Sequence, residues 1–170
     1  MIKALFSGVF AALLLAGCAT VASKVAGGGH DYPEARSYAV SDDASADVDA
    51  ALARAAENGK RVMVVMGANW CHDSRALAGW LATERFQTLI DDKYELVFVN
   101  IGMPQQDDGH NLQIAERFGL DELPGTPNLL VLTAQGELVN ADTATTWRDT
   151  ASREEDAIFS ELQTLADKAV

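Results

Sequence analysis

The chain has 170 residues, which fits a single domain with its own hydrophobic core once a targeting segment is set aside. Its 25 acidic residues outnumber its 13 basic ones and give a formal net charge of −12. Nucleic acids and anionic lipid headgroups repel such a surface, so we expect no nucleic-acid partner. A framework of several disulfides is also excluded, because the only cysteines are Cys18 and Cys71.

The first 17 residues have the pattern of a secretory signal peptide. Lys3 supplies a positive charge near the start, an apolar run covers residues 9–16, and small residues stand directly before Cys18. The apolar run is too short to cross a bilayer as a helix. We therefore expect export, with a buried core helix as the alternative.

The letters LAGC at residues 15–18 resemble the lipobox of bacterial lipoproteins. In that family the cysteine is acylated and becomes the first mature residue. The resemblance implies a lipoprotein signal peptide over residues 1–17 and a membrane anchor on Cys18, held by the burial of acyl chains. It also implies a periplasm-facing protein in the cell envelope. In that family a residue other than aspartate after the cysteine permits transfer to the outer membrane, so the resemblance implies, through Ala19, the outer rather than the inner membrane.

Residues 18–44 are predicted to form a lipidated, flexible tether. They contain three consecutive glycines, a proline and many small residues, with no sustained apolar period. His30 lies within this segment and has no second ligand at metal-binding spacing, so we expect it to be a solvated linker residue.

Folded structure is expected from residue 45 onward. Residues 45–58 predict a helix, because apolar residues recur on one stripe, with Ser45 able to cap its start and Gly59 able to end it. The apolar, β-branched run at 61–67 predicts a strand that is buried on both faces.

Helices and strands are expected to alternate in the next part of the chain. Residues 73–92 predict a helix that can break near Thr83, and residues 94–102 predict a second buried strand. Residues 111–120 predict a short helix closed by Gly119.

The C-terminal part predicts a β-hairpin followed by a helix. The hairpin covers residues 127–141 with its turn at 134–136, and Ser152 and Glu155 form a capping box for the last helix. Strands that alternate with helices need crossover connections, and the hairpin adds an antiparallel part. The predicted fold class is therefore α/β, a central mixed β-sheet flanked by helices on both faces.

Cys71 stands where the first buried strand gives way to a helix. Free N–H groups and the positive end of the helix dipole favour the thiolate at such a position, and the thiolate is the nucleophilic form of cysteine. A protonated His72 would reinforce this effect, and Asp73 would oppose it. A buried and inert cysteine is the alternative, but the flanking His-Asp-Ser is polar for a core site.

Two motifs at separate element boundaries resemble those of the thioredoxin superfamily: WCHDS at 70–74, directly after a strand, and GTP at 125–127, directly before another. The resemblance spans residues 45–168 and implies a thioredoxin-like domain over 45–170. It also implies that the Thr126-Pro127 bond is cis. A cis peptide bond costs little free energy only before proline, so this bond is a physically admissible place for one. Cys71 would then lie directly opposite that bond, at an edge of the domain that solvent can reach.

The resemblance assigns candidate roles around this cysteine. It implies that Thr126 offers backbone groups to an incoming peptide. The catalytic candidates are Cys71 and Ser74, and the substrate-binding candidates are Trp70, His72, Thr126 and Pro127.

Several of these residues also have simpler interpretations. Trp70 is either a core aromatic at a strand end or an apolar docking surface beside the sulfur. His72 is either an exposed residue at a helix start or a partner of the thiolate. The Ser74 hydroxyl satisfies either backbone donors or the Cys71 thiolate. His110 is interpreted as a loop residue, with a metal site shared with Asp107 or Asp108 as the alternative. We predict no metal and no cofactor.

The departures from the family pattern narrow the chemistry. Ser74 stands where thioredoxins carry the second cysteine that releases the substrate, and an alcohol cannot take over that role at neutral pH. Val65 stands where many thioredoxins carry the buried acid that serves that second cysteine. The segment 121–124, DELP, can also reshape the substrate groove.

The leading hypothesis is monothiol thiol–disulfide exchange through Cys71, of isomerase or reductase type, via a mixed disulfide. Its expected partners are cysteine-containing exported client proteins, an external thiol reductant, and the membrane through acylated Cys18. The first alternative is a catalytically silent peptide-binding or chaperone-like module. The second is a peroxide-reactive or redox-sensing thiol that cycles through sulfenic acid.

Overall fold

The computed structural model describes residues 32–169. The predicted signal peptide, Cys18 and His30 lie outside this range, so cleavage, acylation and membrane attachment remain predictions. Within the described range no helix is both long and apolar enough to cross a membrane.

The described chain contains five α-helices, five strands and two short 3₁₀ helices. In chain order they are α1 (Ala44–Asn58), β1 (Arg61–Gly67), α2 (His72–Leu81), α3 (Glu84–Lys93), β2 (Tyr94–Asn100), β3 (Gly102–Met103), η1 (Pro104–Gln106), β4 (Asp108–Gly109), α4 (Gln113–Arg117), β5 (Asn128–Leu132), η2 (Thr146–Ser152) and α5 (Glu155–Asp167).

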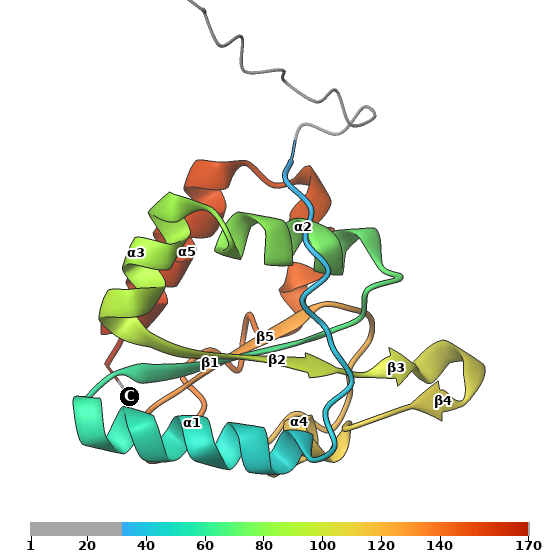
Figure 1. Ribbon diagram of the computed structural model, residues 1–170, viewed down its shortest axis with the longest axis horizontal. Helices are drawn as coiled ribbons and strands as arrows, with labels where there is room; N and C mark the ends of the chain where they lie inside the picture. The colour runs from blue at the N-terminus through green and yellow to red at the C-terminus, as the bar shows by residue number, and fades with distance from the viewer. Residues whose placement is uncertain (1–31, 170) are drawn as a thin grey trace, which may run out of the picture.

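The central sheet has the strand order β2-β1-β5, with β1 parallel to β2 and antiparallel to β5. Helices α1 and α4 cover one face, and α2, α3 and α5 cover the other (Figure 1). The predicted α/β class with a mixed sheet flanked on both faces is confirmed. So is the predicted break near Thr83, which separates α2 from α3.

Strand β1 is the centre of two hydrophobic cores. Met63 and Val65 pack on the side of α2, α3 and α5. Val62, Val64 and Met66 pack on the side of α1 and α4. Because both faces of β1 are buried, its sequence after Arg61 is an apolar run, as predicted.

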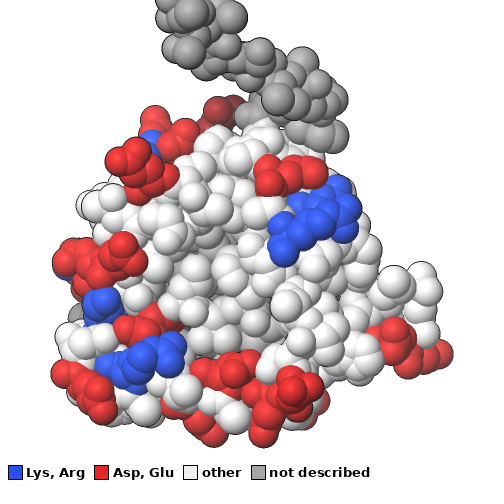
Figure 2. Space-filling model, in the orientation of Figure 1, with Lys and Arg blue, Asp and Glu red and all other residues white. Residues whose placement is uncertain are grey.

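Helix α1 begins one residue earlier than predicted and has a different cap. The carboxylate of Asp43 accepts a hydrogen bond from the backbone N–H of Ala46 at 2.9 Å, so Asp43 and not Ser45 is the N-cap. Gly59 ends the helix as predicted, in the left-handed conformation with φ of 76°. Acidic side chains gather along the edge of the molecule that α1 forms (Figure 2).

The predicted hairpin is present only in part. A turn returns the chain after β5, but the second strand is reduced to a single bridge between Leu132 and Leu138. The buried Asn140 side chain explains this: it accepts a hydrogen bond from Val131 N at 2.8 Å and donates one to Leu129 O at 2.9 Å. A side-chain amide thus replaces the backbone of a second strand.

The predicted capping box at residues 152–155 is wrong. Ser152 is the last residue of η2, and its hydroxyl donates to the carbonyl of Asp149 at 2.8 Å. The hydroxyl is therefore engaged within η2, and α5 begins after Glu154 without a side-chain cap.

The predicted boundary between tether and domain, at residue 44, lies too far along the chain. Residues 32–43 run from α2 past the edge of the sheet to the start of α1 (Figure 1). Tyr38 within them is only 1 % exposed and packs edge-to-face on Phe98 of β2, with ring centroids 5.2 Å apart. Burial of this aromatic ring makes the segment part of the domain.

Candidate active site at Cys71

Cys71 lies at the N-terminal end of α2, as predicted. Its backbone is extended, with φ of −80° and ψ of 128°, and its carbonyl accepts the first helical hydrogen bond, from Arg75 N at 3.1 Å. The free N–H groups of the first turn and the positive end of the helix dipole are thus at the cysteine. However, Cys71 is only 8 % exposed, so it is less accessible to solvent than the sequence predicted.

The cysteine faces the Thr126-Pro127 bond, which is cis as predicted. The Cys71 thiol donates to the carbonyl oxygen of Thr126, with 3.2 Å between Sγ and O. Antiparallel pairing of β1 with β5 places Met66 opposite Asn128 and so brings together the loops that hold these two distant residues. The two motifs therefore form one site.

Ser74 serves the packing of this site instead of the sulfur. Its side chain is fully buried, and its hydroxyl accepts from Ala68 N at 3.3 Å and pairs with the Thr126 hydroxyl at 3.1 Å. Among the hydrogen bonds of residues 32–169, none joins Ser74 to Cys71. Of the two interpretations that the sequence leaves open for Ser74, this geometry favours the partner of a backbone donor over a bond to the Cys71 sulfur.

His72 is exposed, and its imidazole is engaged by its own neighbour. The His72 Nε2 lies 3.0 Å from the Asp73 carboxylate, whose other oxygen accepts from Ala151 N at 2.8 Å. Asp73 is buried and ties the start of α2 to η2. This geometry favours His72 as an exposed helix-start residue over a partner of the Cys71 sulfur.

Trp70 is an exposed aromatic beside the cysteine and not a core residue. Trp70 is 46 % exposed, and its indole N–H donates to the Gly102 carbonyl at 2.8 Å. Gly102 begins the ribbon formed by β3 and β4, which extends beyond the end of β2 (Figure 1). Met103 of that ribbon is also 37 % exposed.

His110 is a loop residue, as predicted. Its Nε2 lies 3.3 Å from a carboxylate oxygen of Asp108, and both side chains are mostly exposed. No cluster of three or more potential metal ligands occurs among residues 32–169.

Two residues that the sequence did not single out hold the loop before Cys71. The Arg75 guanidinium donates to the carbonyls of Asn69 at 3.2 Å and Trp70 at 3.0 Å. It also forms a two-point ion pair with Glu34, which lies far away in the sequence. Neither contact has a local sequence signal, because the partners are set by the fold.

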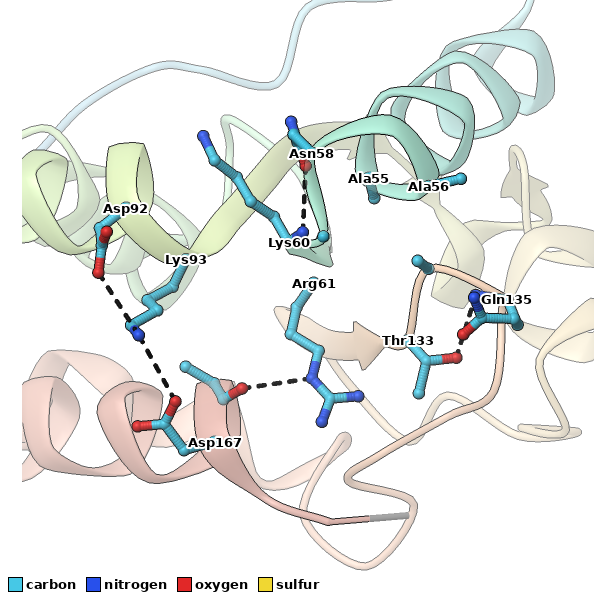
Figure 3. A pocket seen from close by; sticks show the side chains of 13 residues that line it. Ala55, Ala56, Asn58, Lys60, Arg61, Asp92, Lys93, Thr133, Gln135 and Asp167 are labelled. Atoms are coloured by element: carbon cyan, nitrogen blue, oxygen red, sulfur yellow. Dashed lines mark hydrogen bonds and ion pairs between the residues drawn. The ribbon is translucent and has the colours of Figure 1, made fainter.

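A cavity of about 610 Å³ lies at the opposite end of β1 from Cys71 (Figure 3). Its cationic side chains are already engaged. Arg61 donates to the Ala166 carbonyl at 3.3 Å, near the end of α5, and Lys93 lies between the carboxylates of Asp92 and Asp167. Cations at the C-terminal end of a helix stabilise its unpaired carbonyls, so these residues have a structural role here.

Comparison with known proteins identifies the class to which this fold and site belong. A family model described as thioredoxin-like matches residues 43–134, and the chain belongs to that family. A crystal structure of a disulphide isomerase from Xylella fastidiosa Temecula1 is similar, with a TM-score of 0.70 and 24 % sequence identity over 78 % of this chain and 98 % of that chain. At this identity the likeness shows a shared fold. No curated protein gives a significant match.

Proposed function

We propose that this protein performs thiol–disulfide exchange with one thiol, Cys71, through a mixed disulfide with a client protein. The observation that carries the proposal is the place of the sulfur, at the N-terminal end of α2 and 3.2 Å from the Thr126 carbonyl. The helix end favours the thiolate, the form that attacks a disulfide. The thioredoxin-like family and the disulphide isomerase with the same fold support the proposal.

The first step conserves electrons. The Cys71 thiol first gives its proton to water, and the resulting thiolate attacks one sulfur of a client disulfide. The client S–S bond breaks, and the second client sulfur leaves as a thiolate that takes a proton from water. A Cys71–client disulfide replaces the bond that was broken. The Thr126 carbonyl, which accepts the thiol hydrogen in the resting protein, becomes free to accept an N–H from the client backbone.

Release needs a second thiol that Ser74 does not supply. In isomerisation, another thiolate of the client attacks the client sulfur of the mixed disulfide and expels the Cys71 thiolate, with no net oxidation or reduction. In reduction, an external small-molecule thiolate attacks the Cys71 sulfur, a disulfide forms between the small molecule and Cys71, and the client sulfur leaves as a thiolate. A second small-molecule thiolate then attacks the small-molecule sulfur of that bond, which frees Cys71 and yields a small-molecule disulfide. We favour isomerisation because the client and one protein thiol are sufficient for it.

The clients would be exported proteins with cysteines, and the enzyme would face them from the membrane. This part of the proposal depends on the signal peptide and on acylation of Cys18, which places the domain on the periplasmic side, at the outer membrane. The formal charge of −12 favours clients without strongly acidic surfaces.

A binding module without chemistry is the second candidate. The observation that favours it is the low exposure of Cys71, at 8 %, since a sulfur must reach a client disulfide to react. In that case the surface beside Thr126 and Trp70 would hold peptides without covalent capture.

Covalent trapping separates the two candidates. The full-length chain and its Cys71→Ala variant are incubated with a protein whose disulfides have been scrambled, and the adducts are mapped by peptide mass spectrometry. Exchange predicts adducts on the Cys71 peptide that a reductant dissolves and that are lost in the variant. Equal, non-covalent capture by both proteins would contradict exchange and support the binding module. Ser160→Ala, on an exposed position of α5, is the matched control.

A further inference from the structure

We propose that residues 32–41, which we call the strap, position Cys71, with Tyr38 and Glu34 as positioning residues for the loop at 67–71. The strap precedes α1 and crosses the edge of the sheet beside α2 (Figure 1). The inference rests on the proposed function only in taking Cys71 as the reacting group.

Tyr38 is clipped to the cysteine loop through its backbone. Its N–H donates to the side-chain oxygen of Asn69 at 3.2 Å, and the Asn69 amide donates back to the Tyr38 carbonyl at 2.9 Å. The Asn100 amide, at the end of β2, donates to the same carbonyl at 3.0 Å. Asn69 stands two residues before Cys71, so this clip acts directly on the loop.

The side chain of Tyr38 makes a third connection, to the first turn of α2. Its hydroxyl donates to the Ser74 carbonyl at 3.2 Å. Burial raises the pKa of Tyr38 above its ordinary value, so the hydroxyl remains a donor. The ring lies so close to Gly67 that a Cβ on that glycine would stand 2.6 Å from it. Tyr38 therefore touches the loop at its beginning and the helix at its start.

Glu34 holds the loop indirectly, through Arg75. Its carboxylate pairs with Arg75 at two points, 3.2 and 3.3 Å, while the same guanidinium donates to the carbonyls of Asn69 and Trp70. The backbone N–H of Ala35 also donates to the Arg75 carbonyl at 3.0 Å. Glu34 thus holds the Arg75 guanidinium in the position from which it binds the two loop carbonyls.

The strap is fitted to α2 by close backbone contact. A Cβ on Gly79 would stand 2.2 Å from the carbonyl oxygen of Pro33. Only a residue without a side chain permits this approach. The strap, which is part of the predicted tether, therefore packs closely on α2 and makes the contacts that hold the loop at 67–71.

Hydrogen exchange of backbone amides in the loop at 67–71 tests the positioning role. In the full-length chain, Tyr38→Phe removes one hydrogen bond to a helix carbonyl and keeps the ring. We expect exchange in the loop to become about two- to tenfold faster, the range that corresponds to loss of one hydrogen bond.

Tyr94→Phe is the matched control. Tyr94 is also buried, and its hydroxyl donates to a helix carbonyl, that of Leu162, at 2.6 Å. It lies at the start of β2, whereas the loop begins at Gly67, the last residue of β1. We expect Tyr94→Phe to leave exchange in the loop unchanged. An equal effect of the two variants on the loop, or no effect of Tyr38→Phe, would overturn the proposal.

Glu34→Gln tests the second positioning residue, with Asp49→Asn as its control. Asp49 pairs with Arg117 at 2.7 Å on the surface, so both substitutions remove one carboxylate charge. We expect about two- to fivefold faster exchange in the loop for Glu34→Gln only. Unchanged exchange would overturn the role of Glu34.

The alkylation rate of Cys71, measured in the same variants, separates this proposal from the proposed function. A changed rate in Tyr38→Phe but not in Tyr94→Phe supports positioning. Altered loop exchange in a protein that forms no mixed disulfide would refute the exchange function and leave the positioning role intact.

Discussion

Replacing Ser74 with alanine distinguishes a packing role of this residue from a catalytic one. The substitution removes one buried oxygen, which accepts from Ala68 N at 3.3 Å and pairs with the Thr126 hydroxyl at 3.1 Å. Both partners then lose a hydrogen bond in a region that water does not reach. The sulfur of Cys71 loses none, because its bond is to the Thr126 carbonyl.

The expected cost follows from the groups left without a partner. A buried donor without an acceptor costs about 1–3 kcal/mol, and the cavity left by one oxygen is small. For a domain of this size, each kcal/mol lowers the melting temperature by roughly 3–4 °C. We therefore expect Ser74→Ala to melt roughly 3–12 °C below the wild type in a calorimetric or circular-dichroism scan. Ser160→Ala, at an exposed position, should remain within about 0.5 kcal/mol of the wild type.

Alkylation of Cys71 completes the test, because a packing role and a catalytic role differ in this readout. At a temperature where both proteins are folded, we expect the Ser74→Ala rate to stay within a few-fold of the wild type. An unchanged melting temperature with a rate lowered more than about tenfold would refute the packing role. It would show that the hydroxyl serves the thiolate after all.

Three further substitutions test other parts of the structure. Gly79→Ala should displace the segment around Pro33, because the added Cβ would stand 2.2 Å from its carbonyl oxygen; limited proteolysis should then cut this segment faster, and unchanged resistance would contradict the contact. A hydrogen bond and ion pair with Arg54 holds the pKa of Glu95 below its usual value, so the folded state binds fewer protons than the unfolded state. The pair therefore stabilises the folded state fully above about pH 4.5 and progressively less as the pH falls through the lowered pKa. Urea titrations of Glu95→Gln should therefore show a loss of up to about 1 kcal/mol at pH 7 and almost none at pH 3, and an equal loss at both values would contradict the assignment. Asn140→Ala should cost about 2–4 kcal/mol in the same assay, since two buried backbone groups of β5 lose their partners, and a loss below about 0.5 kcal/mol would argue against the amide as a substitute strand.

The parts of the fold that were predicted correctly depend on local patterns. The run at 61–67 is apolar at nearly every position because both faces of β1 are buried. Gly59 ends α1 because a left-handed residue closes a helix most easily as glycine. The cis Thr126-Pro127 bond opposite Cys71 was expected from the resemblance of the two motifs to the thioredoxin superfamily and not from a local pattern.

The parts that were missed depend on partners far away in the sequence. Tyr38 resembles a linker residue until the fold brings Asn69 and Asn100 to its backbone. Asn140 gives no local sign that its amide will replace a strand. The role of Ser74 was open for the same reason, because its position three residues after Cys71 also fits a bond to the sulfur, and only the place of Thr126 decides between the two.

The most direct test of the central claim is the alkylation rate of Cys71 at one fixed pH in the full-length chain, compared between the folded protein and the protein unfolded in denaturant and followed by mass spectrometry of the peptide that contains Cys71. If the end of α2 activates the sulfur for exchange, Cys71 should react faster in the folded protein than in the unfolded one. A Cys71 that reacts no faster in the folded protein, or that does not react until the protein is unfolded, would contradict the claim that this cysteine is the nucleophile.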